Sequence, residues 1–168
     1  MKILETRRVV LRWLQPGDAP FILELLNDPA WLLHIGDKRV RSLDAARAYI
    51  ENGPVAMYAK HGIGLYLVEG KDGGAAMGLC GLIKRDALPD VDIGFAFLPQ
   101  FRGRGYALES ARATMEYGRT TLGLARIVAI TTQNNQDSAR LLEKLGMRFE
   151  STLRMPGDDE DLRLYATP

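Results

Sequence analysis

The segment from Gln100 to Ala107 has the residue types of a phosphate-binding loop between a strand and a helix. It follows the apolar run 91–99, which ends in a proline, and it precedes a helical pattern that continues to about Thr121. Gly103 and Gly105 allow the backbone to approach a ligand closely and to adopt torsions that a Cβ would resist. Because the N–H groups and the dipole of a first helical turn favour an anion, the loop predicts a phosphate site.

Arg102 and Arg104 would add charge-assisted donors beside this loop. A nucleotide-binding P-loop ends in Gly-Lys-Ser/Thr, whereas this loop ends in Gly-Tyr-Ala. A dinucleotide-binding fold needs a third glycine and repeated βαβ units, which the sequence lacks. The alternatives that remain are a site for another phosphate-bearing ligand and a plain glycine-rich turn.

The strand expected over 91–98 differs between its two faces, because successive side chains of a strand point in opposite directions. One face is large and apolar, with Val91, Ile93, Phe95 and Phe97. The other face has a carboxylate and small side chains, with Asp92, Gly94, Ala96 and Leu98. Either this second face leaves room for a ligand, or a helix packs closely on it while Asp92 lies in water at the rim of the sheet.

Composition narrows the class of protein. A chain of 168 residues is expected to form one domain over 1–168 with a core that needs no disulfide or metal. A net charge of +1 argues against a nucleic-acid partner, so any phosphate binding must be local. The single cysteine, Cys80, excludes an internal disulfide, and no apolar run approaches the roughly twenty residues of a membrane span. We expect a cytoplasmic protein without a membrane partner.

Hydrophobic periodicity predicts strands and helices in mixed order, and therefore an α+β fold with a single mixed sheet. Asn52-Gly53-Pro54 is expected to end the second helix, and no clear period is visible over 28–36. Expected strands lie at about 8–14, 64–69, 76–83, 91–98, 124–131, 147–153 and 162–166. Expected helices lie at about 18–26, 42–51, 107–121 and 135–145.

Two histidines are candidate bases, since histidine titrates near neutral pH. His34 lies in the unpatterned segment 28–36 beside Trp31, whereas His61 lies in a turn and is expected to face solvent. No cluster of His, Cys and carboxylates has the spacing of a metal site, so none is predicted. The acidic loop 157–161 is a solvated hairpin tip or, alternatively, attracts a cationic amine.

A second motif lies downstream of the loop. The sequence Asn-Asn-Gln-Asp-Ser at 134–138 continues into a helix that closes with Glu-Lys-Leu-Gly-Met at 143–147. Together, the two segments resemble the GNAT superfamily of acyl-CoA-dependent N-acetyltransferases, with its pyrophosphate loop (Gln/Arg-x-x-Gly-x-Gly/Ala) and its Asn-x-x-Ser helix. The opening segment 5–12 and Asp18 resemble the RimJ/RimL-like branch of that superfamily in particular.

The resemblance spans nearly the whole chain. It implies a mostly antiparallel sheet of six to seven strands, flanked by helices, with a central pair of strands that splay apart. It also implies acetyl-CoA as the co-substrate, with Trp31 and His34 beside the acceptor amine. The pyrophosphate of acetyl-CoA would bind the backbone N–H groups of Arg102, Gly103, Arg104, Gly105, Tyr106 and Ala107. Other cofactor contacts would come from the backbone of Phe95, Ala96 and Phe97, one of them polarising the thioester carbonyl, and from Asn135 and Ser138.

The reaction implied is direct transfer, in which a neutral primary amine attacks the thioester and coenzyme A leaves as thiolate. Asp92 is the candidate base, acting through an ordered water, provided that burial raises its pKa. Many family members place a tyrosine before Glu-Lys-Leu-Gly as the acid for the thiolate, but this chain has Leu142. Ser138 is the substitute donor that the resemblance suggests, although Asn135 and Ser138 also suit a plain helix cap.

Several alternatives stay open at this point. The acceptor is a protein N-terminus or a small-molecule amine, and the enzyme is a monomer or a homodimer. A non-catalytic acyl-CoA-binding or sensing domain would keep the phosphate loop without a proton route. A nucleotide-binding module would bind ATP in preference to coenzyme A.

Overall fold

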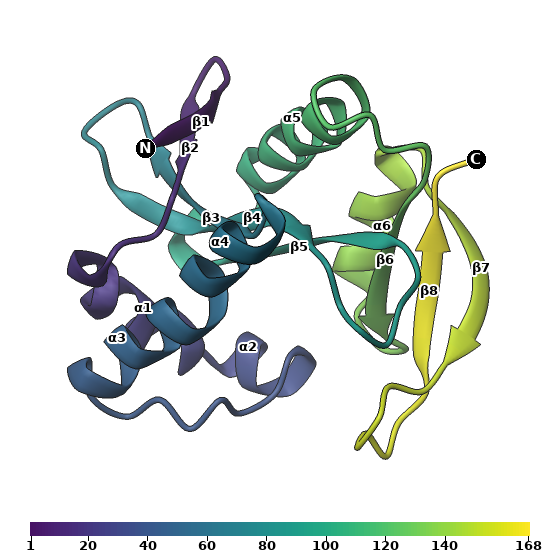
Figure 1. The fold of residues 1–168 in the computed structure, drawn as a ribbon, viewed down its shortest axis with the longest axis horizontal. Coiled ribbons are helices and arrows are strands. Elements are labelled where there is room, and N and C mark those ends of the chain that lie inside the picture. The colour runs from purple at the N-terminus through teal and green to yellow at the C-terminus, as the bar shows by residue number, and fades with distance from the viewer.

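A computed structural model describes residues 1–168 and has one eight-stranded sheet with helices on both of its faces (Figure 1). Neighbouring strands are antiparallel, apart from the central pair β5 and β6, which are parallel. The strands lie side by side in the order β1 (Lys2–Glu5), β2 (Val9–Arg12), β3 (Leu65–Gly70), β4 (Ala76–Ile83), β5 (Val91–Phe97), β6 (Ile127–Thr132), β8 (Leu162–Ala166) and β7 (Arg148–Leu153).

The helices connect these strands. Short 3₁₀ turns lie at η1 (Pro16–Asp18) and η3 (Pro99–Phe101), and a π turn lies at η2 (Glu51–Val55). No helix is both long and apolar enough to cross a membrane. The α-helices are α1 (Ala19–Leu26), α2 (Pro29–His34), α3 (Leu43–Ile50), α4 (Ala56–His61), α5 (Tyr106–Thr120) and α6 (Gln136–Lys144).

The α+β class, the mixed sheet and its splayed central pair are confirmed, and the sheet has one strand more than the upper limit expected. The additional strand is β1, whose four residues pair with β2 at the edge of the sheet. Its sequence, Lys-Ile-Leu-Glu, does not alternate between polar and apolar residues, so periodicity gives no signal for a strand.

Two segments differ from their expected structure. Asn52-Gly53-Pro54 does not end the helix that Ser42 caps, because the wider π turn η2 continues the chain from α3 into α4. An i→i+5 turn tolerates the missing N–H of Pro54, which an α-helix interior would not. The segment 28–36 contains helix α2, which begins where Asp28 Oδ2 accepts a hydrogen bond of 3.1 Å from the Ala30 N–H.

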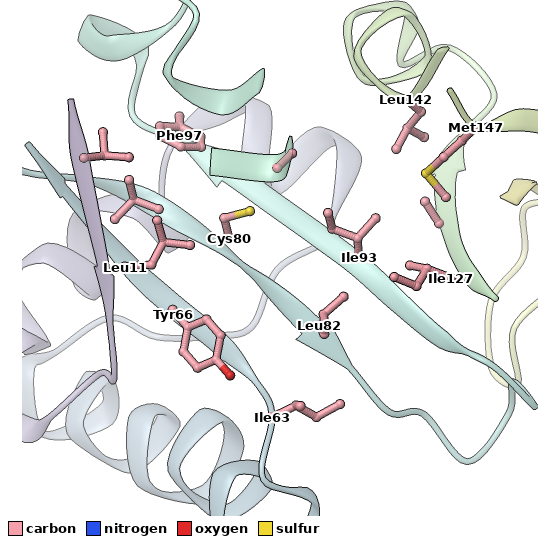
Figure 2. Packing of buried hydrophobic residues seen from close by; sticks show 14 of the residues in the cluster. Leu11, Ile63, Tyr66, Cys80, Leu82, Ile93, Phe97, Ile127, Leu142 and Met147 are labelled. Carbon is pink, nitrogen blue, oxygen red and sulfur yellow. The ribbon is translucent and has the colours of Figure 1, made fainter. Parts of the chain in front are cut away.

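Each face of the sheet has its own hydrophobic core. Seventeen buried residues, including Ile93, Phe97 and Leu142, form the core on the side of α5 and α6, and α4 contributes Tyr58 to it (Figure 2). Twelve others pack between the sheet and the helices α1 to α3. Cys80 is a fully buried member of the first core, and burial raises the pKa of its thiol to about 12. Cys80 is therefore not a nucleophile at neutral pH.

The centre of the sheet opens at β5 and β6. The two strands are paired only at Val91 with Ile127 and at Asp92 with Val128. Beyond Asp92 they diverge, whereas β5 remains paired with β4 along its whole length. The divergence leaves one edge of β5 without a neighbouring strand from Ile93 onwards.

Close packing of β4 against β3 gives a test of the fold. A Cβ at Gly81 would lie 2.1 Å from the Gly64 carbonyl oxygen and 2.8 Å from Leu65 Cα, both backbone atoms. We expect Gly81→Ala to lower the free energy of unfolding by about 1–3 kcal/mol, as for overpacked cores. Gly17→Ala is the matched control, because nothing lies within 4 Å of its Cβ position. Equilibrium urea unfolding measures both variants, and equal stabilities would contradict this packing.

Candidate active site

A cleft of about 770 Å³ lies where β5 and β6 diverge. One end is formed by the loop before α5 and by the start of α6, and the other end by α2, α3 and η2. Of the residues expected in a site, the cleft is lined by Trp31, His34, Asp92, Phe95, Ala96, Phe97, Arg102, Gly103, Gly105, Tyr106, Ala107, Asn135 and Ser138. The structure therefore brings together thirteen of the fourteen expected site residues, and only Arg104 does not line the cleft.

The loop before α5 has the backbone that phosphate binding requires. Gly103 and Gly105 adopt left-handed conformations, with φ of 74° and 84°, and α5 begins directly afterwards at Tyr106. A Cβ at Gly103 would meet nothing within 4 Å, so the loop borders open space. The N–H groups of the first turn of α5 have no partner within the helix, and they suit an anion such as pyrophosphate.

The two arginines of this loop differ in their positions. Arg102 lines the cleft, but it donates through Nε to the Phe97 carbonyl at 2.9 Å and through Nη2 to Asp28, the residue that caps α2. Arg104 does not line the cleft. That these two side chains add donors for a phosphate therefore stays a prediction, and the backbone of the loop is the donor set that the geometry favours.

An interaction that the sequence reasoning missed holds the loop from behind. Arg8 donates to the Arg104 carbonyl at 3.0 Å and to Glu109 Oε1 at 2.7 Å, and its guanidinium lies 4.3 Å from the centre of the Tyr106 ring. Thr6 also donates to Glu109. These contacts tie the first turn of α5 to the segment before β2. Sequence separations of about a hundred residues gave no local signal for them.

The edge of β5 offers hydrogen-bonding groups to the cleft. Residues of an antiparallel strand direct their N–H and C=O groups alternately to either side. Leu98 donates to the Met77 carbonyl at 3.0 Å, so Leu98 and Ala96 face β4, whereas Phe95 and Phe97 face the gap. The expectation for Ala96 is therefore corrected, because it lines the cleft with its small side chain and not with its backbone groups.

Asp92 is buried at the start of the gap. Its side chain is 1% exposed, and Oδ2 accepts a hydrogen bond of 2.7 Å from Arg85 Nε. Oδ1 is also buried and has no hydrogen-bond partner. Burial raises the pKa of Asp92, although the neighbouring Arg85 charge opposes that rise. Asp92 is thus not in water at the rim of the sheet, and its environment is the one that a carboxylate base requires.

The start of α6 is capped as the sequence indicated. Asn135 Oδ1 accepts a hydrogen bond of 3.2 Å from the Ser138 N–H, and both residues line the cleft. Leu142 is fully buried in the core, so the position of the family's usual tyrosine offers no acid. Asn135 therefore both caps α6 and lines the cleft, and Ser138 contributes its backbone N–H to the cap, which leaves its hydroxyl free of this role.

Trp31 and His34 bring α2 to the mouth of the gap. His34 Nδ1 lies 3.0 Å from Thr132 Oγ1 at the end of β6, and Trp31 is buried with no hydrogen-bond partner for its Nε1. His61 is exposed and lies outside the cleft, as expected. No residue of the acidic loop 157–161 lines the cleft, so nothing in its position supports a role with a cationic amine.

The cleft has further residues that sequence reasoning missed. Arg85 lies between β4 and β5 and contacts Asp92, and Tyr49 lines the cleft from α3. Burial raises the pKa of Tyr49, and the charge of Arg85 opposes that rise. The antiparallel pairing of β4 with β5 is the signal that could have placed Arg85 near Asp92. No such signal exists for Tyr49, because α3 is distant from β5 in the sequence.

Comparisons with known proteins show the family to which this chain belongs. The chain is 31% identical over 156 residues to the uncharacterized N-acetyltransferase YoaA of Bacillus subtilis, covering 90% of this chain and 86% of YoaA. An acetyltransferase structure from Agrobacterium tumefaciens superimposes with a TM-score of 0.84 at 25% identity, covering 100% of this chain and 94% of that one.

RimL, a ribosomal L7/L12 alpha-N-protein acetyltransferase whose structure was solved in complex with coenzyme A, has the same fold. Its TM-score is 0.83 at 19% identity, with 99% of this chain and 97% of RimL covered. The family model for the acetyltransferase (GNAT) domain matches residues 8–148. The chain therefore belongs to the GNAT family and is an acetyl-CoA-dependent acetyltransferase.

Proposed function

We propose that this enzyme transfers an acetyl group from acetyl-CoA to a primary amine by direct attack within a ternary complex. The observation that carries the proposal is the position of Asp92, a buried carboxylate with one unpartnered oxygen at the point where β5 and β6 separate. Cys80, the one thiol of the chain, is buried in the core and does not line the cleft. Direct transfer needs no nucleophile from the protein.

The residues at the opening of the sheet fit coenzyme A. The loop from Gly103 to Ala107 offers backbone N–H groups to the pyrophosphate. Phe95 and Phe97 offer backbone groups to the pantetheine amides, although Arg102 already occupies the Phe97 carbonyl. Asn135 lines the cleft at the start of α6, on the opposite side of the gap. Acetyl-CoA supplies the acyl group as an activated thioester.

Asp92 acts as the base. It accepts a proton from the acceptor ammonium through an ordered water, because its short side chain is fixed by Arg85. One backbone N–H of β5 polarises the thioester carbonyl. The Ser138 hydroxyl donates a proton to the departing thiolate, while the Ser138 backbone N–H bonds to the capping side chain of Asn135. The acceptor is a protein N-terminus or a small amine, and the enzyme acts in the cytoplasm as a monomer or homodimer.

A non-catalytic domain that binds acyl-CoA is the second candidate that the sequence left open. Such a domain needs the loop before α5 but has no use for a buried carboxylate in the same cleft. Burial of Asp92 without a second hydrogen-bond partner costs stability, which favours a catalytic reason for its presence.

The loop before α5 gives the first test of this proposal. We expect Gly105→Val to abolish acetyl-CoA binding measured by calorimetry, because a β-branched residue resists the φ of 84° and crowds the loop. Gly123→Val is the matched control, since Gly123 has a similar φ of 68° but lies after α5, away from the cleft. Circular dichroism verifies that both variants fold. If Gly105→Val does not fold, Gly105→Ala is tested in its place. Wild-type affinity in a folded Gly105 variant would show that the cofactor binds elsewhere.

Replacement of Asp92 tests the base. We expect Asp92→Asn to lower turnover by roughly 10²- to 10⁴-fold while acetyl-CoA binding is retained. Asp86→Asn is the control, because Asp86 is an exposed acid of the same β4–β5 connection and does not line the cleft.

The pH profile separates a base from a structural residue. Because burial raises the pKa of Asp92, the wild-type rate should rise with pH through a value above that of an ordinary aspartate. Asp92→Asn should lack this rise, and its deficit should shrink at higher pH as the neutral amine becomes abundant. A variant that matches the wild-type rate at every pH would exclude Asp92 as the base.

A further inference from the structure

The wall of the cleft around Asp92 is mostly apolar. On the face of the sheet opposite α5, the cleft is lined by Leu25, Trp31, Tyr49, Pro54 and Met57 from the helices and turns above the sheet. Leu65, Leu79 and Ile83 line it from β3 and β4. Such a surface suits an apolar group on the acceptor amine.

Gly94 brings this apolar wall close to Asp92. It follows Asp92 on the same face of β5, and a Cβ at Gly94 would lie 3.1 Å from Ile83 Cδ1 and 3.5 Å from Leu65 Cδ2. A side chain at this position would press against Ile83 and Leu65. The glycine therefore lets both apolar side chains line the cleft beside the carboxylate.

The same wall offers a positive charge to a ligand. The Arg85 guanidinium forms one hydrogen bond within the chain, from Nε to Asp92, and none from its two terminal nitrogens. The Arg85 side chain is 40% exposed and lines the cleft. The Tyr49 hydroxyl likewise has no hydrogen-bond partner within the chain. Tyr49 also lines the cleft, and the charge of Arg85 opposes the rise in the pKa of its hydroxyl that burial causes.

Negative charge for a polycationic acceptor is scarce in this cleft. Its acidic lining residues are Asp28, Asp92 and Asp137. Asp28 pairs with Arg102 and Asp92 pairs with Arg85, while Asp137 is 99% exposed on α6 and pairs with Arg140. A polyamine would bring several ammonium groups to carboxylates that arginines already neutralise.

We propose that the acceptor is a small apolar α-amino acid. Its carboxylate binds the terminal nitrogens of Arg85, assisted by the Tyr49 hydroxyl. Its amine reaches Asp92 through the ordered water, and its side chain packs on the apolar wall. A peptide N-terminus is disfavoured, because the group in place of the carboxylate is a neutral amide. This inference rests on the acetyl transfer proposed above, in which an N–C bond forms, the thioester C–S bond breaks, the amine proton passes towards Asp92 and coenzyme A leaves as thiolate.

The test compares each amino acid with the amine that lacks only its carboxylate. Phenylalanine, leucine and methionine are paired with their decarboxylated amines, and spermidine and peptides with free N-termini complete the panel. Acetyl-CoA turnover gives kcat/KM for every acceptor with the wild type, Arg85→Gln, Tyr49→Phe and the control Arg119→Gln. Arg119 lies on α5 outside the cleft and pairs with Glu116.

The informative quantity is the preference for the amino acid over its decarboxylated partner. Any effect of Arg85→Gln on the basicity of Asp92 acts on both amines and cancels in this ratio. We expect the ratio to fall by roughly 10- to 100-fold in Arg85→Gln, as for the loss of a hydrogen bond between charged groups, by less in Tyr49→Phe, and not at all in Arg119→Gln.

The outcomes separate this inference from the acetyltransferase activity itself. A ratio that is unchanged in Arg85→Gln would overturn the carboxylate site, and so would a wild-type preference for spermidine, peptides or the decarboxylated amines. Either result would leave acetyl transfer intact. Absence of turnover with every acceptor of the panel would contradict both the inference and the proposed function.

Discussion

Two neighbouring parallel strands that pair at only two positions impose the main constraint on this structure. Buried backbone N–H and C=O groups need partners, and the edge of β5 beyond Asp92 has no strand beside it. Part of this requirement is met internally, since Arg102 donates to the Phe97 carbonyl. The remaining groups border the cleft, where an extended ligand with amides of its own can complete the sheet.

The surrounding elements follow from that opening. Arg102 joins the end of β5 to Asp28 at the start of α2, so one ion pair links the two ends of the cleft. Arg8 and Glu109 hold the first turn of α5 against the segment before β2. Asp92 lies at the last position where β5 pairs with β6, and therefore at the point where the cleft opens. Positioning therefore relies on a few charged side chains that link distant segments.

Local sequence predicted the features that depend on local physics. The two glycines before α5, the cap at Asn135 and the alternating faces of β5 are set by backbone torsion, capping and strand geometry, and the structure has all three. Long-range features were missed or mistaken. The Arg102 side chain, the backbone direction of Ala96, and the positions of Arg85 and Tyr49 depend on register and on tertiary contacts, which no local pattern specifies.

Amide chemical shifts test the central claim, that coenzyme A occupies the opening between β5 and β6, most directly. In a titration of the ¹⁵N-labelled protein with coenzyme A, we expect the largest shifts at Phe95, Phe97 and the segment 103–107, with slower hydrogen exchange at the two phenylalanine amides. Small shifts at all of these amides, with the largest changes on another face of the protein, would contradict it.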